Sequence, residues 1–161
     1  MPPDPEIFAL AQQVGERLRQ LRKSIAVAES CTGGLLGAAL TDVPGSSAYF
    51  LGGVISYADQ VKLDQLRVPE ATLRRYGAVS EETAAAMASG VRQLLHADIG
   101  VSITGVAGPD VQGSKPVGLT FIGIAAAVSM TKRFQWTGDR WDNRRRSVIA
   151  ALELLVQTLG R

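Results

Sequence analysis

The sequence predicts an α/β fold, a three-layer α/β/α single domain over residues 1–161 with a mixed, mostly parallel sheet. Segments with apolar residues at helical spacing alternate with short apolar runs, an order typical of helices packed on both faces of a sheet. The last two apolar runs are separated by a tight turn at Ser129-Met130 and form a hairpin, which makes the sheet mixed. A length of 161 residues suits one domain, and 46% hydrophobic with 20% charged residues is an ordinary globular composition.

Local signals set the expected elements. Asp4 and Pro5 form an N-cap and first-turn signature for a helix that continues to about Lys23. The expected strands are 24–28, 49–57, 99–104, 117–128 and 133–136. The expected further helices are 33–40, 58–66, 69–76, 81–96 and 142–159, with Ser80 as an N-cap. Gly52-Gly53 inside the second strand indicates a bulge or a close approach of the backbone.

Cysteine and charge content limit the compartment and the partners. The one cysteine, Cys31, allows no internal disulfide, which is typical of a reducing compartment. No signal-peptide pattern follows Met1, and no apolar run is long enough to span a bilayer. The net charge of +2 does not favour a nucleic-acid partner, although residues 132–146 are rich in arginine. We therefore expect a cytoplasmic protein without a membrane or nucleic-acid partner.

Ser30 is the first candidate functional residue. It lies where the buried run 25–27 turns into an expected helix, within the stretch Ala-Glu-Ser-Cys-Thr-Gly-Gly of residues 28–34. This junction places a hydroxyl beside unpaired backbone N–H groups at the positive end of a helix dipole. Such a position suits either a nucleophile or a bound anion.

A serine nucleophile needs a base that takes its proton. His96 is followed by Asp98, but nothing places it near Ser30, so a surface histidine at a helix end is the favoured interpretation. Lys62 follows the strand that ends at Tyr57 by one short helical turn, and a buried lysine with a lowered pKa can act as a base. From spacing alone, an exposed helix lysine is favoured.

The residues after Ser30 leave alternatives open. Cys31 could be the nucleophile, because a helix N-terminus lowers the pKa of a thiol. However, no histidine partner is evident, and a small buried cysteine is the commoner case. Thr32 and Gly33 could donate backbone N–H groups to a developing oxyanion, or they could simply cap the helix.

Further polar residues lie at expected strand ends and at the start of the last helix. Ligands of α/β proteins bind where loops leave the carboxyl ends of strands, and Ser30, Tyr57 and Thr104 lie at such ends. Arg140 and Arg144 are four residues apart and share a helix face. They could clamp a phosphate or a carboxylate, or they could belong to a solvated face.

No motif in the sequence indicates a cofactor or a metal. The glycine-bearing stretch 105–109 follows a strand, but it has the spacing of neither a dinucleotide fingerprint nor a P-loop. No set of His, Cys, Asp and Glu residues has metal-ligand spacing. We therefore expect neither a cofactor nor a metal.

Seven motifs together resemble the CinA C-terminal domain family. They are residues 28–34, 43–47, 49–57, 77–82, 103–109, 115–118 and 138–140. They occur in the family order and cover almost the whole chain. The full-length relatives have an additional N-terminal domain, so we expect this chain to be the stand-alone form.

The resemblance implies a nicotinamide-nucleotide amidohydrolase of the PncC type. Such an enzyme converts nicotinamide mononucleotide and water into nicotinic acid mononucleotide and ammonia, a step of pyridine nucleotide recycling in NAD metabolism. The resemblance also implies a small-molecule nucleotide substrate, no metal, and a homodimer or a higher homo-oligomer.

The resemblance assigns roles residue by residue. Ser30 and Lys62 match the catalytic serine and lysine, with Tyr57 at the strand end before the lysine. Backbone N–H groups from Cys31 to Gly33 would stabilise the oxyanion. Tyr57 and Thr104 would orient the amide or the lysine, and Gly105 is a further expected substrate-binding residue. Charge and motif position, rather than the resemblance, lead us to expect that Arg140, together with Arg144 and Ser47, holds the phosphate.

The chain departs from the family pattern at two points. The loop after Pro109 reads Asp-Val-Gln-Gly-Ser over residues 110–114, where a glycine run is usual. Asp59 stands where asparagine is frequent, and a carboxylate there would favour the charged form of Lys62. Two other functions remain open: a hydrolase of another amide or damaged nucleotide, and a non-catalytic nucleotide-binding module associated with competence.

Overall fold

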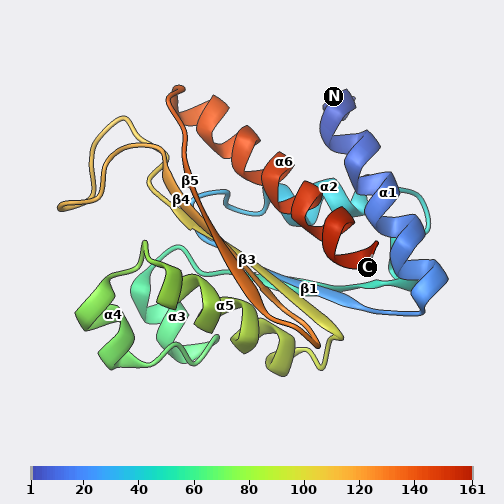
Figure 1. The fold of residues 1–161 in the computed structure, drawn as a ribbon, viewed down its shortest axis with the longest axis horizontal. Coiled ribbons are helices and arrows are strands. Elements are labelled where there is room, and N and C mark those ends of the chain that lie inside the picture. Colours follow the sequence, from blue (N-terminus) through green and yellow to red (C-terminus); the bar gives the residue numbers. More distant parts are fainter. Residues whose placement is uncertain (1, 161) are drawn as a thin grey trace.

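A five-stranded sheet lies at the centre of the computed structural model, which describes residues 2–160 (Figure 1). The strands are β1 (Ile25–Glu29), β2 (Phe50–Ile55), β3 (Ile99–Gly105), β4 (Leu119–Ala125) and β5 (Met130–Gln135). Their order across the sheet is β2-β1-β3-β4-β5. β1 is parallel to β2 and β3, whereas β4 is antiparallel to β3 and β5. Four strands thus run one way and β4 runs the other, which confirms the mixed, mostly parallel sheet.

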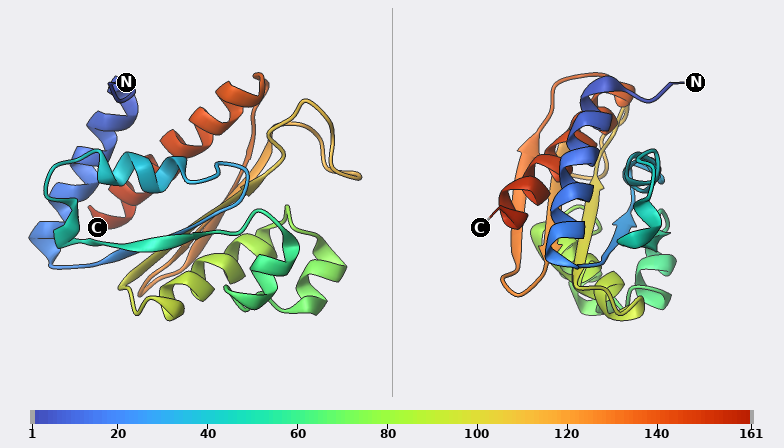
Figure 2. Two further views of the ribbon diagram at one scale, coloured as in Figure 1. Left: turned by 180° about the vertical axis from the view of Figure 1, so that it is seen from behind. Right: turned by 90° about the vertical axis from the view of Figure 1, so that its right-hand side faces the viewer.

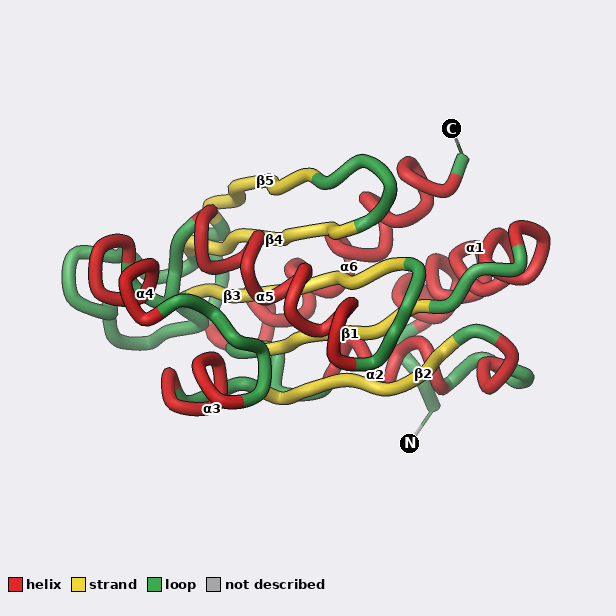
Figure 3. The backbone as a smooth tube through the Cα atoms, turned by 90° about the horizontal axis from the view of Figure 1, so that it is seen from below, coloured by secondary structure: helices red, strands yellow, loops and turns green. Residues whose placement is uncertain are grey.

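Helices cover both faces of the sheet, as expected for an α/β/α architecture (Figure 2). The helices of one layer are α1 (Pro5–Leu21), α2 (Leu35–Thr41) and α6 (Arg140–Leu159). Those of the other layer are α3 (Asp59–Asp64), α4 (Glu70–Tyr76) and α5 (Glu81–Leu94). Figure 3 shows α5 lying along the sheet over its central strands. Within residues 2–160, no helix combines the length and apolar character needed to cross a membrane.

Side-chain caps explain where three helices begin. The carboxylate of Asp4 accepts the N–H groups of Glu6 and Ile7 at the start of α1, and the Ser80 hydroxyl accepts the Thr83 N–H at the start of α5. Both expected caps are therefore confirmed. Asp139 caps α6 in the same way, so α6 begins two residues earlier than the sequence predicts.

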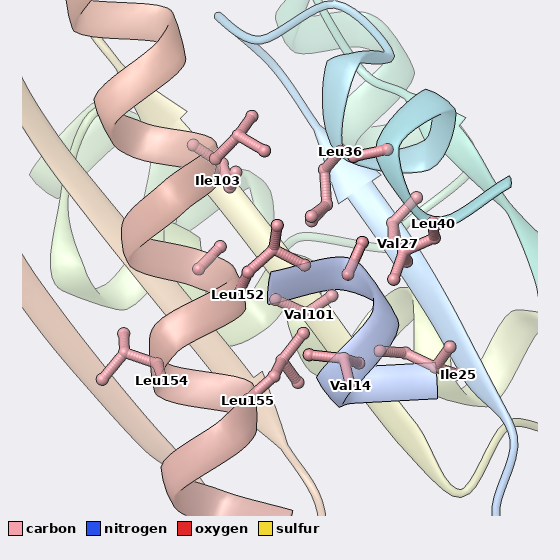
Figure 4. Close-up of a cluster of buried hydrophobic side chains, with 14 of the residues drawn as sticks. Val14, Ile25, Val27, Leu36, Leu40, Val101, Ile103, Leu152, Leu154 and Leu155 are labelled. Carbon is pink, nitrogen blue, oxygen red and sulfur yellow. The ribbon is translucent and has the colours of Figure 1, made fainter. Parts of the chain in front are cut away.

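The larger hydrophobic core lies between the sheet and the layer of α1, α2 and α6 (Figure 4). Its buried side chains include Val14, Ile25, Val27, Leu36, Leu40, Val101, Ile103, Leu152 and Leu155. On the opposite face, Ala26 and Ala28 pack in a second cluster with Met87 and Val91 of α5. β1 is thus buried on both faces, and the residue that follows it is held in place by packing on either side.

The glycine pair in β2 produces both features that the sequence indicates. Ile25 pairs with Phe50 but Ala26 pairs with Gly52, so Leu51 is an extra residue that forms a bulge. A Cβ atom added at Gly53 would overlap Val27 of the neighbouring strand. β2 can therefore lie close to β1 only with glycine at position 53.

The hairpin strands differ from their expected lengths. β4 is shorter than the expected 117–128, and β5 is longer than the expected 133–136. The reason is the pairing of Met130 with Ile124, which places the turn at residues 126–129 and not at Ser129-Met130.

Candidate active site

A cavity of about 270 Å³ lies at the carboxyl ends of β1 and β3. Because these strands are parallel, their carboxyl ends meet at one edge of the sheet, where ligands of α/β folds bind. The predicted site residues that line it are Ser30, Cys31, Tyr57, Lys62, Thr104, Gly105 and Arg140. Residues 110–112, from the loop that departs from the family pattern, also line it, as do Ala78 and Val79, which the sequence did not single out. Segments from five parts of the chain therefore meet at one cavity.

The structure places the Lys62 amine against the Ser30 hydroxyl. Lys62 Nζ lies 3.2 Å from Ser30 Oγ, within hydrogen-bonding distance. The same Nζ donates to the carbonyl oxygens of Ser56 at 2.6 Å and Tyr57 at 3.3 Å. Only 1% of the Lys62 side chain is exposed, so the expectation from spacing alone, an exposed helix lysine, is wrong.

Burial shifts the protonation equilibrium of Lys62. Loss of solvent lowers the pKa of the Lys62 amine below its ordinary value, because the charged form is poorly solvated in the protein interior. The Asp59 carboxylate, 3.9 Å from Nζ, raises this pKa and opposes the effect of burial. Asp59 is largely exposed, and the lowering by burial is the larger of the two effects. Asp59 thus moderates the shift without cancelling it.

Glu29 holds the turn that follows β1. Its buried carboxylate accepts the Thr32 hydroxyl at 2.7 Å and the backbone N–H groups of Leu36 and Gly37 at 2.9 Å. Gly33 and Gly34 have φ values of 59° and 105°, so α2 starts only at Leu35. The N–H groups of Leu36 and Gly37 at the start of α2 are therefore occupied by a carboxylate of the protein itself and are not available to an external anion.

Arg144 contacts the same turn from α6. Its Nε donates to the carbonyl oxygen of Cys31 at 3.1 Å, and its Nη2 donates to that of Thr32 at 3.0 Å. Arg144 does not line the cavity. The expectation that Arg144 clamps a phosphate is therefore not supported, because its guanidinium is engaged by backbone carbonyls behind the turn.

The turn leaves two N–H groups for an oxyanion. The Gly33 N–H already donates to the Ser30 carbonyl at 3.1 Å, so Gly33 is not available as expected. Within residues 2–160, the N–H groups of Cys31 and Thr32 have no backbone or side-chain acceptor. The Ser30 N–H donates to Ile103 of β3, which extends the ladder of β1 by one residue. The available donors of the turn are thus Cys31 and Thr32.

Arg140 and Tyr57 meet at the mouth of the cavity. Arg140 Nη2 donates to the Tyr57 hydroxyl at 3.1 Å, and Nη1 donates to the Gly108 carbonyl at 2.6 Å. The Tyr57 side chain is 60% exposed. Tyr57 therefore contributes to the site twice, since its backbone carbonyl orients Lys62 and its ring forms part of the cavity mouth.

Thr104 and Gly105 form a wall of the cavity at the end of β3. The buried Thr104 hydroxyl donates to the Ala78 carbonyl at 2.7 Å. Ser47 lies elsewhere, in a short 3-10 turn (Ser46–Ala48) that precedes β2. The cavity lies beyond the other end of this strand, so the structure does not bring Ser47 to the expected site.

The two alternative catalytic residues receive no support from the structure. Burial raises the pKa of the Cys31 thiol to about 11, which disfavours the thiolate needed for attack. His96 is exposed at the end of α5, with φ 52°. The nearby Asp98 carboxylate accepts from Ser24. The expected surface histidine is confirmed.

Glu29 and Ser56 contribute hydrogen bonds to the candidate site, and the sequence did not single them out. Glu29 could have been noticed as a carboxylate at the end of an otherwise apolar strand, because a buried charge needs several donors. The contribution of Ser56 is a backbone carbonyl, and its residue type contains no signal for it. Among residues 2–160, no group of three or more His, Cys, Asp or Glu side chains is placed to hold a metal ion.

The family model for the CinA C-terminal domain matches residues 7–159. A protein of Halothermothrix orenii named as competence-damage inducible is 52% identical over 139 residues, which cover 84% of this chain and 34% of that protein. A CinA-like protein of Chlorobium limicola is 51% identical over 150 residues, covering 89% and 35%. The chain thus spans about a third of the length of the curated relatives it matches.

Solved structures share both the fold and the sequence pattern. The competence/damage inducible protein CihA of Agrobacterium tumefaciens is 36% identical, with a TM-score of 0.95 over 100% of both chains. A CinA superfamily protein of Klebsiella pneumoniae is 31% identical, with a TM-score of 0.93 over 96% of this chain and 98% of that one. With a family model that covers nearly all of its residues, the chain belongs to the CinA C-terminal domain family.

Proposed function

We propose that this chain is an amidohydrolase that deamidates nicotinamide mononucleotide through Ser30 and Lys62. The observation that supports this most directly is the 3.2 Å approach of the buried Lys62 amine to the Ser30 hydroxyl inside a cavity. A lysine in a binding module needs no buried position beside a serine. A lysine that acts as a general base needs both the contact and a lowered pKa.

The hydrogen bonds of Lys62 suit its neutral form. A neutral amine has two hydrogens and one lone pair. The carbonyl oxygens of Ser56 and Tyr57 accept the two hydrogens, which directs the lone pair to Ser30 Oγ. Lys62 can then accept the Ser30 proton without moving, so the two carbonyls set the orientation of the base.

The reaction then follows the usual course of acyl transfer. Ser30 Oγ forms a bond to the carboxamide carbon as its proton passes to Lys62, and the N–H groups of Cys31 and Thr32 stabilise the oxyanion. The bond from carbon to nitrogen breaks, and Lys62 returns the proton so that ammonia leaves. Lys62 next takes a proton from water, which attacks the ester. The acid product separates as Lys62 returns that proton to Ser30 Oγ.

Charges around the cavity fit the two ends of this nucleotide. Its pyridinium ring is cationic, and the carboxylates of Asp59 and Asp110 line the cavity. Its phosphate is anionic, and Arg140 is the arginine at the cavity mouth. We therefore assign the phosphate to Arg140 and not to Arg144.

The test is ammonia release from nicotinamide mononucleotide by the wild type, Ser30→Ala and Lys62→Met. Lys132→Met serves as the matched control, because Lys132 lies on β5 over the Phe134 ring, away from the cavity. Activity in the wild type and the control that disappears in both folded variants would support the proposal. Activity that survives in Ser30→Ala would show that another residue is the nucleophile.

The names of these relatives refer to competence and damage, and not to a reaction. The same Ser30–Lys62 pair would equally serve hydrolysis of another amide or of a damaged nucleotide. An inactive, well-folded wild type would remove the proposed substrate and favour these alternatives or a binding module. The cytoplasmic location and the homodimer or higher homo-oligomer stay predictions, and light scattering during size-exclusion chromatography tests the latter.

A further inference from the structure

We propose that Arg144 is a positioning residue that holds the Cys31–Thr32 peptide so that its N–H can stabilise the oxyanion. The inference rests on the proposed function of Ser30. It gives Arg144 a role in the rate of the chemical step, whereas the sequence alone suggests a role in substrate binding.

The contact of Arg144 with the turn is bidentate. Its Nε and Nη2 bind the carbonyl oxygens of two successive residues, Cys31 and Thr32. A planar guanidinium presents its donors in a fixed fork, so two such bonds fix the orientation of two peptide groups together. The guanidinium also lies against Gly33, since an added Cβ there would come 3.6 Å from Nη2. The turn is thus held by a side chain from a helix 112 residues further along the chain.

Because a peptide group is planar, the contact of Arg144 with each carbonyl also fixes the direction of the N–H group on the opposite side of the turn. In a trans peptide the C=O and the N–H point in opposite directions. Because Arg144 binds the Cys31 carbonyl, the Thr32 N–H of the same peptide points away from Arg144. Because Arg144 binds the Thr32 carbonyl, the Gly33 N–H points away as well, and it donates to the Ser30 carbonyl at 3.1 Å. A charge-assisted bond to the C=O also polarises the N–H and makes it a stronger donor.

Thr32 is held from a second direction by Glu29. Its hydroxyl donates to Glu29 Oε1 at 2.7 Å while its carbonyl accepts from Arg144. The Glu29 carboxylate and the Arg144 guanidinium therefore bind the same residue of the turn, Thr32. Neither side chain lines the cavity, to which the turn contributes Ser30 and Cys31.

The experiment compares Arg144→Met and Arg144→Lys with Arg146→Met, whose wild-type arginine pairs with Asp142 on the surface of the same helix. We expect Arg144→Met to lower kcat for nicotinamide mononucleotide about 100-fold with KM nearly unchanged, because a displaced donor weakens stabilisation of the transition state. Arg144→Lys should recover only part of kcat, since lysine cannot bind both carbonyls in one plane. Arg146→Met should match the wild type. Low millimolar guanidinium should partly restore kcat in Arg144→Ala.

A raised KM with unchanged kcat in Arg144→Met would overturn the proposal and return Arg144 to substrate binding. Unchanged values of both would also overturn it. Thermal unfolding of each variant establishes that a loss of kcat is not a loss of fold.

A second measurement keeps the inference separate from the choice of substrate. Phenylmethylsulfonyl fluoride modifies a reactive serine: Ser30 Oγ would form a bond to sulfur, fluoride would leave, and the proton would pass to Lys62. If the wild type releases no ammonia, mass spectrometry of this modification decides the question. Slower modification of Ser30 in Arg144→Met than in the wild type supports the positioning role. Equal rates, including no modification of either protein, overturn it.

Discussion

The inner wall and the outer rim of the cavity are built differently. The inner wall consists of Ser30, Lys62 and Thr104, whose side chains are at most 9% exposed. Each of its polar groups has a partner on the backbone or within the wall. The outer rim comprises Tyr57, Arg140 and the loop 106–118, and Tyr57 and Val111 are about 60% exposed. In Figure 1 this loop projects from the end of the sheet.

This difference in burial suggests that the inner wall and the outer rim have different roles. Positions on the inner wall are set by the sheet and by buried hydrogen bonds, so their geometry is available before a substrate arrives. On the rim, Tyr57 and residues 109–114 are exposed to solvent, so we expect them to adapt to what enters. We therefore expect changes at the inner wall to alter kcat or stability, and changes at the rim to alter substrate choice. Four predictions test this division, from the largest expected effect to the smallest.

Lys62→Met should lower kcat for nicotinamide mononucleotide by about 10⁴-fold, because the proposed general base in contact with Ser30 Oγ is lost. Steady-state ammonia release measures the change. KM should vary far less, since Lys62 contacts the nucleophile rather than the phosphate. A kcat within tenfold of that of the control Lys132→Met would contradict a catalytic inner wall.

Arg140→Met should lower kcat/KM for nicotinamide mononucleotide about 10- to 100-fold, mainly through KM, because a charge-assisted hydrogen bond to phosphate is lost. Nicotinamide riboside, which lacks the phosphate, should be processed almost equally by the variant and the wild type. Parallel assays of the two substrates measure this. Equal losses for both substrates would assign Arg140 to the inner wall instead.

Glu29→Gln should reduce the free energy of unfolding by about 2 kcal/mol, because an amide NH₂ would face a backbone N–H donor in a buried position. Urea denaturation measures the change. Glu16→Gln, at an exposed position of α1, is the control and should leave stability unchanged. A stability equal to that of the control would mean that the turn does not depend on this carboxylate.

Asp59→Asn should shift the acidic limb of the pH profile of kcat/KM to lower pH. The Asp59 carboxylate raises the pKa of Lys62, so its removal leaves burial unopposed and the neutral amine persists at lower pH. The variant should therefore be more active than the wild type at pH values below the wild-type limb. Asp64→Asn makes the same change of charge on α3 and should not move the limb.

The sequence was sufficient for the order of the elements and for Ser30, because a buried strand followed by a glycine-bearing turn has few other interpretations. It was insufficient for Lys62 from spacing alone, since a short helix does not reveal which face is buried. The resemblance to known relatives identified Lys62, and the structure places it against Ser30.

The two arginines show a limit of sequence patterns. Arg140 and Arg144 share a helix face, and spacing treats them alike, but one lies at the cavity mouth and the other behind the turn of Ser30. That distinction depends on where the turn meets α6, a contact between residues more than 100 positions apart. The expectation that Ser47 binds the phosphate is not supported for a related reason. The six residues of β2 lie between Ser47 and the end of this strand that reaches the cavity.

The bulge at Leu51 determines which residue of β2 lies opposite the carboxyl end of β1, next to Ser30. Every β2 residue after it pairs with a β1 residue one position earlier than in an unbroken strand, up to Ile55 opposite Glu29. With this register the segment that follows β2 begins beside the end of β1, where the Ser56 N–H donates to the Glu29 carbonyl at 2.7 Å, and six residues later the same segment places Lys62 against Ser30. If Ser30 and Lys62 act together as proposed, activity would require the correct pairing of β1 with β2, and a protein in which this pairing is shifted would be inactive.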